Sequence, residues 1–435
     1  MAGPGGKFWI HEKLSTPAVH HQSFKALWET KWKPLCDMGV YPFMFGATKD
    51  FQPVVDEIIQ KDLKEPYDWD EYAQCFFPKA EELVSAAITA EKEGNKPKAS
   101  ELYLRASALY RIARFPAPRS ERQRYAWEMG KEAARKGLGL HEFPMIEVNI
   151  PHTKHAGPGD GSTLPGFYHL PAGASSSNKV PLVIIFTGLD GYRTELAVWK
   201  EGWRQAGCAT LIVEIPGTGD NPGAPADPAS PDRVWSSMFD WVARQPEIDQ
   251  ARIVNWGVQH RRLLQHPPRA HTRRQAAVRG RPGRRVPLHV RPSLARQCGS
   301  PRVPLRVSVP VPKHCFVSLM VLSHTLCYKF GYGKDFTRFK KEAMDKFSLL
   351  KDGTLDKPCA QLILVNGTED EIFPIDDYHL CLQHGSPKRA RFIRDRKHMG
   401  EPESFMIILQ DLFDVLEIKA NPGKFLSTLP FQPKY

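Results

Sequence analysis

The chain has 435 residues, 41% of them hydrophobic, so it can bury a large core without disulfides. Its eight cysteines form no C-x-x-C pair and have no regular spacing, which argues against a zinc site and a disulfide framework. The first residues lack an apolar signal core, and no apolar run approaches the roughly 20 residues of a membrane helix. We therefore expect a cytoplasmic protein without a membrane span, a metal or an organic cofactor.

The formal net charge of +12 suggests a nucleic-acid-binding protein, but the charge is concentrated in one segment. Residues 259–326 contain 13 Arg, one Lys and no Asp or Glu, and without these 14 charges the chain stands at −2. Nucleic-acid-binding segments interleave aromatic with basic side chains or present a folded basic face. Residues 259–315 contain no Phe, Tyr or Trp, so we expect no nucleic-acid partner.

Residues 1–142 are predicted to form an aromatic-rich, helical region. Residues 8–72 carry several Trp and Phe side chains, which indicates irregular and helical structure that covers another part of the protein. Apolar residues three and four positions apart predict an antiparallel helix pair at Glu81–Glu93 and Lys98–Ile112. A third helix is expected from the capping residue Ser120 to Gly137.

From residue 143 to residue 435, strands and helices alternate as they do around a parallel sheet. Two continuous aliphatic runs are typical of strands that are buried on both faces. The expected strands are Ile146–Ile150, Phe167–Leu170, Val180–Phe186, Ala209–Ile215, Arg252–Trp256, Gln361–Val365 and Arg391–Ile393. The expected helices are Glu195–Gln205, Pro231–Arg244, Phe336–Phe347, Asp376–His384 and Glu403–Ile418. The sequence thus predicts one α/β domain with a mainly parallel sheet, preceded by the helical region.

Two candidate catalytic residues follow successive strands near the end of the chain. Asp370 lies after the predicted strand Gln361–Val365, and His398 lies after Arg391–Ile393. An acid after one late strand and a histidine after the next is the order of an α/β-hydrolase, in which the nucleophile precedes both. The acid would orient the imidazole so that its other nitrogen accepts the proton of the nucleophile. The alternative is that Asp370 caps a helix and His398 is an ordinary loop histidine.

The loop at residues 186–192, Phe-Thr-Gly-Leu-Asp-Gly-Tyr, follows the first long buried strand. At this place an α/β-hydrolase supplies a backbone N–H to its oxyanion hole, and Leu189 and Asp190 are the candidates for it. The alternative is a tight strand–helix turn that uses two glycines. The later loop at residues 214–220 lacks the spacing G-x-G-x-x-G, so we do not expect dinucleotide binding.

The nucleophile of such an enzyme is absent from its expected place. The strand Arg252–Trp256 should lead into a G-x-S-x-G elbow, but the chain continues Gly-Val-Gln-His-Arg-Arg, with Gln259 at the position of the serine. A Pro-Pro pair also stands where the next helix should begin. Read one base later, the codons of this stretch can give Gly-Val-Ser-Thr-Gly-Gly, a well-formed elbow.

We therefore interpret residues 259–326 as an aberrant or disordered segment that does not belong to the fold. A reading-frame slip just before Gln259, with the frame restored by about Cys327, would produce it. The alternative is an authentic Arg/Pro-rich insertion in a hydrolase.

With these motifs the chain resembles the fungal heptaketide hydrolases of the yellowish-green conidial pigment type, a branch of the FrsA-like α/β-hydrolases. The resemblance implies an α/β-hydrolase fold and hydrolytic shortening of an aromatic polyketide. A naphthopyrone heptaketide would lose an acetoacetyl unit and give a tetrahydroxynaphthalene for melanin synthesis. The acid and base of the family's triad fall on Asp370 and His398, and its serine falls on position 259. The resemblance covers residues 24–43, 187–193, 214–233 and 346–402 and lapses over residues 259–326.

The resemblance also implies that residues 1–142 act as a lid over a flat aromatic substrate. Two alternatives stay open for the function. The first is a catalytically dead hydrolase-fold protein, because Gln259 replaces the serine, and the second is an esterase of another secondary-metabolite pathway. The expected partner is a small-molecule polyketide, and a homodimer is left open.

Overall fold

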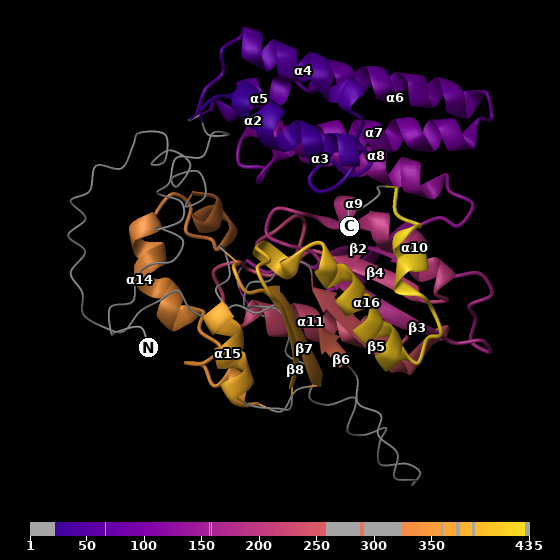
Figure 1. Ribbon diagram of the computed structural model, residues 1–435, viewed down its shortest axis with the longest axis vertical. Helices are drawn as coiled ribbons and strands as arrows, with labels where there is room; N and C mark the ends of the chain where they lie inside the picture. The colour runs from indigo at the N-terminus through magenta and orange to yellow at the C-terminus, as the bar shows by residue number, and fades with distance from the viewer. Residues whose placement is uncertain are drawn as a thin grey trace.

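The computed structural model describes residues 22–65, 67–155, 157, 159–257, 288–290, 324–357, 360–370, 375–384 and 388–430. Within these residues a helical region, coloured indigo to purple, lies at one end of a sheet that carries helices on both faces (Figure 1).

The helical region consists of seven α-helices and one π-helical turn among the described residues. The three predicted helices are confirmed as α6, α7 and α8, and the capping box of Ser120 and Gln123 at the start of α8 is present. Helix α6 begins before the predicted Glu81, because Pro78 is tolerated in a first helical turn. The elements are α2 (Phe24–Leu27), η2 (Trp28–Trp32), α3 (Lys33–Met38), α4 (Thr48–Gln60), α5 (Trp69–Gln74), α6 (Phe77–Lys92), α7 (Lys96–Arg114) and α8 (Glu121–Gly139).

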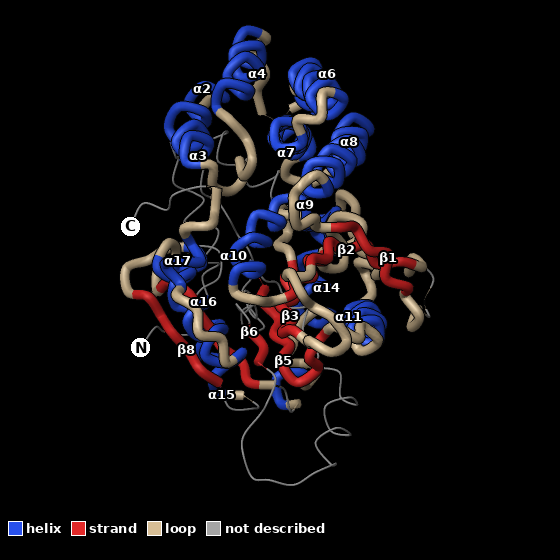
Figure 2. Tube along the Cα trace, turned by 90° about the vertical axis from the view of Figure 1, so that its right-hand side faces the viewer, coloured by secondary structure: helices blue, strands red, loops and turns tan. Residues whose placement is uncertain are grey.

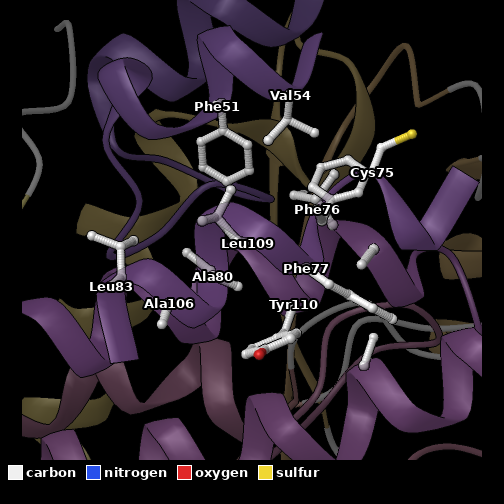
Figure 3. Close-up of a cluster of buried hydrophobic side chains, with 14 of the residues drawn as sticks. Phe51, Val54, Cys75, Phe76, Phe77, Ala80, Leu83, Ala106, Leu109 and Tyr110 are labelled. Atoms are coloured by element: carbon white, nitrogen blue, oxygen red, sulfur yellow. The ribbon is translucent and has the colours of Figure 1, made fainter. Parts of the chain in front are cut away.

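The aromatic side chains of this region mostly pack against one another. Phe43 and Phe51 meet edge to face with ring centroids 5.1 Å apart, and both are buried. Figure 3 shows Phe51 of α4 above Leu109 and Tyr110 of α7 in the same cluster. We expected the aromatic side chains to cover another part of the protein, but most of them form the region's own core. Edge-to-face pairs add to the burial of apolar area, so this core stabilises the region internally.

Among the described residues the sheet has eight strands, in the order β1-β2-β4-β3-β5-β6-β7-β8. The pairs β1–β2 and β2–β4 are antiparallel, and the pairs from β4 through β3, β5, β6 and β7 to β8 are parallel. The mainly parallel sheet predicted from the alternating elements is therefore confirmed. The strands are β1 (Ile146–Pro151), β2 (Thr163–His169), β3 (Val180–Phe186), β4 (Ala209–Val213), β5 (Ile248–Gly257), β6 (Leu288–Val290), β7 (Gln361–Gly367) and β8 (Lys388–Ile393).

Alternate residues of the strands pack on opposite faces of the sheet. Val183 and Ile185 of β3 face the cluster that includes α10, α16 and α17, whereas Leu182 and Ile184 face the cluster that includes α11. Figure 2 shows α16 and α17 on one side of the strands and α11 on the other. The remaining elements are α9 (Arg193–Leu196), η3 (Ala197–Trp199), α10 (Lys200–Gln205), α11 (Ser230–Val242), α14 (Phe336–Lys346), η4 (Thr354–Asp356), α15 (Ile375–Gln383), η5 (His398–Gly400), α16 (Glu403–Leu416) and α17 (Pro422–Leu426).

Part of the segment that we expected to be aberrant or disordered belongs to the fold. Leu288–Val290 forms β6, which pairs in parallel with β5 on one side and with β7 on the other. Residues 324–326 begin a helical stretch, in which Leu326 is buried. These residues are therefore ordered, because a strand between β5 and β7 depends on backbone hydrogen bonds more than on a particular sequence. That the segment is aberrant in sequence stays a prediction. Gln259 and the rest of the segment lie outside the described residues.

Candidate active site

The strands that precede the candidate residues end at the same edge of the sheet. Phe186 at the end of β3 is in register with Gly257 at the end of β5. Gly367 at the end of β7 is in register with Ile393 at the end of β8. These four strands therefore end at one edge of the sheet, where open α/β folds bind their ligands.

Asp370 and His398 meet at this edge. The Nδ1 atom of His398 lies 3.0 Å from Oδ2 and 3.2 Å from Oδ1 of Asp370. The carboxylate also accepts a hydrogen bond from the backbone N–H of Met399 at 3.2 Å. The Asp370 side chain is fully buried, whereas 23% of the His398 side chain is exposed. A ring that donates from Nδ1 has its basic lone pair on Nε2, so the geometry fits an acid that orients a general base.

Two glycines allow the loops of Asp370 and His398 to approach each other. A Cβ atom on Gly367 would lie 2.1 Å from the carbonyl oxygen of Arg396. Gly400 has a φ of 71°, and a Cβ there would lie 2.9 Å from the Gly367 nitrogen. The backbone N–H of Glu369 donates to Arg396 O at 2.8 Å and ties the loops together. No sequence motif indicated these glycines, although both lie within three residues of the candidate residues.

The loop after β3 holds the oxyanion-hole candidates at the same edge. Leu189 packs against the cluster on the α11 face and against the cluster of residues 326–347. The carbonyl oxygen of Asp190 accepts a hydrogen bond from Arg114 Nη1 at 2.8 Å. In the part of the chain that the structure describes, no acceptor is paired with the backbone N–H of Leu189 or of Asp190. The role of these two N–H groups in an oxyanion hole stays a prediction.

The expected position of the nucleophile follows β5 directly. Because Gly257 is in register with Phe186, the chain leaves β5 beside the loop that carries Leu189 and Asp190. Strand β6 lies between β5 and β7, and the loop after β7 carries Asp370. The strand leading to the site is therefore as predicted, while Gln259 lies outside the described residues.

The loop at residues 214–220 has a structural role in the described contacts. Arg193, which is 1% exposed, pairs with Glu214 at 2.9 Å and with Asp220 at 2.9 Å. Burial opposes the charge of Arg193, but the surrounding carboxylates, with Glu214 first, raise its pKa. Trp127 and Lys131 of α8 also donate to Asp220, at 2.9 and 3.0 Å. This loop thus joins the sheet to the helical region.

A Ser-His-Asp set that no sequence motif indicated lies at Ser237, His152 and Asp160. His152 Nδ1 lies 2.9 Å from the hydroxyl of Ser237, and His152 Nε2 lies 3.5 Å from Asp160. All three side chains are buried, and Ser237 donates its proton to the carbonyl of Arg233 at 3.0 Å. Burial opposes the charge of Asp160, but hydrogen bonds, with Arg233 first, lower its pKa to about 2. Because the Ser237 hydroxyl donates its proton to a carbonyl within its own helix, this serine fits a structural role and not that of a nucleophile.

No group of three or more His, Cys, Asp or Glu side chains that could hold a metal is found among the described residues. The helices described here include none that is both long and apolar enough to cross a bilayer.

Comparison with known sequences finds distant relatives and no matching family model. The chain is 23% identical over 217 residues to an esterase FrsA of Photobacterium profundum, covering 49% of this chain and 47% of the relative. It is 29% identical to the hydrolase LUC6 of a Fusarium species, covering 42% of each chain. It is 28% identical to the α/β hydrolase ucsC of an Acremonium species, covering 42% of this chain and 40% of the relative. The chain thus matches less than half the length of these relatives.

Solved structures show the fold. A 2,6-dihydroxy-pseudo-oxynicotine hydrolase has a TM-score of 0.59 and 16% identity, over 90% of this chain and 98% of its own. The protein AbyA5 has a TM-score of 0.52 and 17% identity, over 88% of this chain and 94% of its own. The chain therefore has the α/β-hydrolase fold, as its sequence predicts.

Proposed function

We propose that the chain represents a serine-type hydrolase of the FrsA-like α/β-hydrolases, with His398 as general base and Asp370 as the acid that orients it. The observation that carries the proposal is the hydrogen bond between them at the carboxyl edge of the sheet. In this proposal the backbone N–H groups of Leu189 and Asp190 form part of the oxyanion hole. The distant relatives named as an esterase and as hydrolases support hydrolytic chemistry.

The proposed reaction needs a serine at position 259. Its hydroxyl oxygen would attack the acyl or ketone carbon of the substrate while His398 Nε2 takes the proton. The negative charge that develops on the substrate oxygen would be stabilised by the loop amides. His398 would then return the proton to the departing carbon or oxygen, and water would release the acyl group. The amide of Gln259 has no proton whose removal gives a comparable nucleophile, so the chain as printed lacks this step.

For the substrate, we propose an aromatic polyketide. A naphthopyrone heptaketide would lose an acetoacetyl unit and give a tetrahydroxynaphthalene in a pigment or melanin pathway. The resemblance of residues 24–43, 187–193, 214–233 and 346–402 to fungal heptaketide hydrolases supports this substrate, and the two fungal relatives fit secondary metabolism. Residues 1–142 would bound the substrate on the side away from the sheet. A cytoplasmic location belongs to the same proposal.

We also propose that a reading-frame slip explains Gln259. The described strand β5 ends at Gly257, where the elbow should begin, and the frame one base later can supply Gly-Val-Ser-Thr-Gly-Gly. The second candidate function is a hydrolase-fold protein that binds its ligand without cleaving it. Gln259 favours this function if the printed sequence is authentic.

The test compares the printed chain with a restored-frame chain, in which residues 259–326 are read one base later where the transcript shows it. The transcript across codons 258–327 is sequenced first. Both chains are then assayed with a naphthopyrone heptaketide and with p-nitrophenyl butyrate. We expect turnover only in the restored-frame chain, since loss of the triad serine costs about 10⁶-fold in kcat in a well-studied protease.

His398→Ala in the restored-frame chain is the matched control and should lose activity to a similar degree. An unshifted transcript, together with a printed chain that binds the naphthopyrone without turnover, would favour the binding protein. A restored-frame chain whose activity survives His398→Ala would disprove the proposed base.

A further inference from the structure

Arg114, at the end of α7, links the helical region to the candidate oxyanion loop. Its Nη1 atom donates to the carbonyl oxygen of Asp190 at 2.8 Å, and its Nη2 atom donates to the carboxylate of Glu195. Arg114 and Glu195 are both fully buried. One planar guanidinium thus holds the backbone of the loop and the first turn of α9 at the same time, which the single ammonium of a lysine cannot do in this geometry.

The guanidinium of Arg114 is fixed on its other sides. Its Cζ atom lies 3.8 Å from the ring centroid of Tyr192, and that ring meets Trp127 of α8 edge to face at 5.0 Å. The other oxygen of the Glu195 carboxylate accepts from Thr194 at 2.5 Å. Burial opposes the charge of Arg114, but Glu195 and its other neighbours raise its pKa. Arg114 is therefore charged and has little freedom to turn.

A second contact from the helical region reaches the same loop. Arg111 donates to the carbonyl oxygens of Pro42 and Met44 and so fixes the turn that carries Tyr41. The Tyr41 ring lies close to Gly191: a Cβ atom added to Gly191 would lie 3.2 Å from Tyr41 Cε2. The loop is therefore enclosed by α7, by the Tyr41 turn and by its own strand.

We propose that Arg114 is a positioning residue that holds the loop 187–192 in place for the oxyanion hole. The carbonyl of Asp190 lies in the same peptide plane as the N–H of Gly191, so this plane cannot turn without breaking a charge-assisted hydrogen bond. With this plane fixed, the preceding peptide groups, which carry the N–H groups of Asp190 and Leu189, have less freedom to turn before any substrate arrives, as preorganised oxyanion donors require. In this proposal the helical region contributes a fixed contact to the site. The catalytic meaning of this positioning rests on the proposed function.

The competing explanation is that Arg114 only neutralises Glu195. The two explanations differ for Glu195→Gln, which removes the charge of Glu195 but keeps the bond from Arg114 to Asp190 O. They also differ for Arg114→Met, which removes that bond. Arg105 of the same helix supplies a matched control, because it is buried and pairs with Asp50 at 2.6 Å and Glu101 at 2.9 Å without touching the loop.

The experiment measures backbone order parameters of Leu189, Asp190 and Gly191 by NMR relaxation of the deuterated, ¹⁵N-labelled full chain. Rigid backbone gives about 0.85 and flexible backbone gives less than about 0.6. We expect rigid values in the printed chain, in Glu195→Gln and in Arg105→Met. Arg114→Met should lower the three values below about 0.6, while residues of β3 and β4 stay near 0.85.

Because Arg114→Met leaves the Glu195 carboxylate buried without this partner, its folding is checked by thermal unfolding. The double variant Arg114→Met with Glu195→Gln removes that charge and tests the same loop. A loop that stays rigid without Arg114, or that loosens as much in Glu195→Gln or Arg105→Met, would overturn the proposal. The order parameters are measured without substrate turnover. An inactive restored-frame chain would therefore contradict the proposed function but would not affect the result for Arg114.

Discussion

The imidazole of His398 lies 3.0 Å from the carboxylate of Asp370, although 28 positions separate them in the chain. The contact is possible because β7 and β8 are neighbouring parallel strands whose ends, Gly367 and Ile393, are in register. The carboxylate of Asp370 is buried, whereas the imidazole of His398 is partly exposed. The buried acid can therefore orient the imidazole, and the imidazole remains accessible at the edge of the sheet. This geometry leads to the first prediction.

Asp370→Asn in the restored-frame chain should reduce kcat by about 10⁴-fold, with a smaller change in KM. An asparagine keeps the shape but favours the wrong tautomer of His398, which is the effect known for the corresponding aspartate of serine proteases. Steady-state kinetics with p-nitrophenyl butyrate measure it. An Asp370→Asn variant with unchanged kcat would remove Asp370 from the site.

Gly367→Ala should destabilise the protein by about 1–3 kcal/mol, because overpacking forces the neighbouring backbone to move. The new Cβ would lie 2.1 Å from the carbonyl oxygen of Arg396, in the loop that leads to His398. The free energy of unfolding in urea measures the change, and kcat of the restored-frame chain should fall with it. Gly139→Ala is the control, since its Cβ would meet nothing within 4 Å, and it should leave both quantities nearly unchanged. Equal effects of the two substitutions would contradict the close approach of the loops.

Ser237→Ala should leave the activity of the restored-frame chain intact and lower the stability. The Ser237 hydroxyl accepts from Lys154 N at 3.0 Å and lies 2.9 Å from His152 Nδ1, so its removal leaves buried groups without this partner. The expected cost is about 1–3 kcal/mol, measured by urea unfolding. Loss of turnover at unchanged stability would instead make Ser237 a candidate nucleophile.

His141 should make stability depend on pH in the weakly acidic range. Burial, with the Lys200 ammonium in second place, lowers the pKa of His141 from 6.5 to about 4. Between these values the unfolded chain binds a proton that the folded chain does not, so stability should fall as pH is lowered from about 6.5 to about 4. Urea unfolding across this range measures the slope.

His141→Gln keeps an acceptor for Lys200, whose Nζ atom lies 2.9 Å from His141 Nδ1, but it removes the titrating group. The slope should become shallower in this variant. A slope that is the same with and without His141 would assign the pH dependence to other groups.

Much of the hydrolase part could be predicted because its signals are local. The apolar runs of β3 and β4 indicate strands buried on both faces, and the order of Asp370 and His398 after late strands indicates where they would meet. Helical structure was expected in residues 8–72, but the individual helices α2 to α5 were not predicted, since aromatic residues suit many conformations and short helices depend on their surroundings. Gly367 and Gly400 were also missed, because a glycine that permits a close approach looks like any loop glycine until the second backbone is in place.

The sequence by itself determined the alternation of strands and helices, the residues at the ends of the strands and the absence of a serine at position 259, because each depends on residue types within a short stretch. The tertiary structure decided which distant groups touch. It placed Leu288–Val290 between β5 and β7, it brought His152 to Ser237 of α11, and it brought Arg114 to the carbonyl of Asp190. These contacts join segments that lie far apart in the chain, and only the packing of complete helices against the sheet brings them within hydrogen-bond distance.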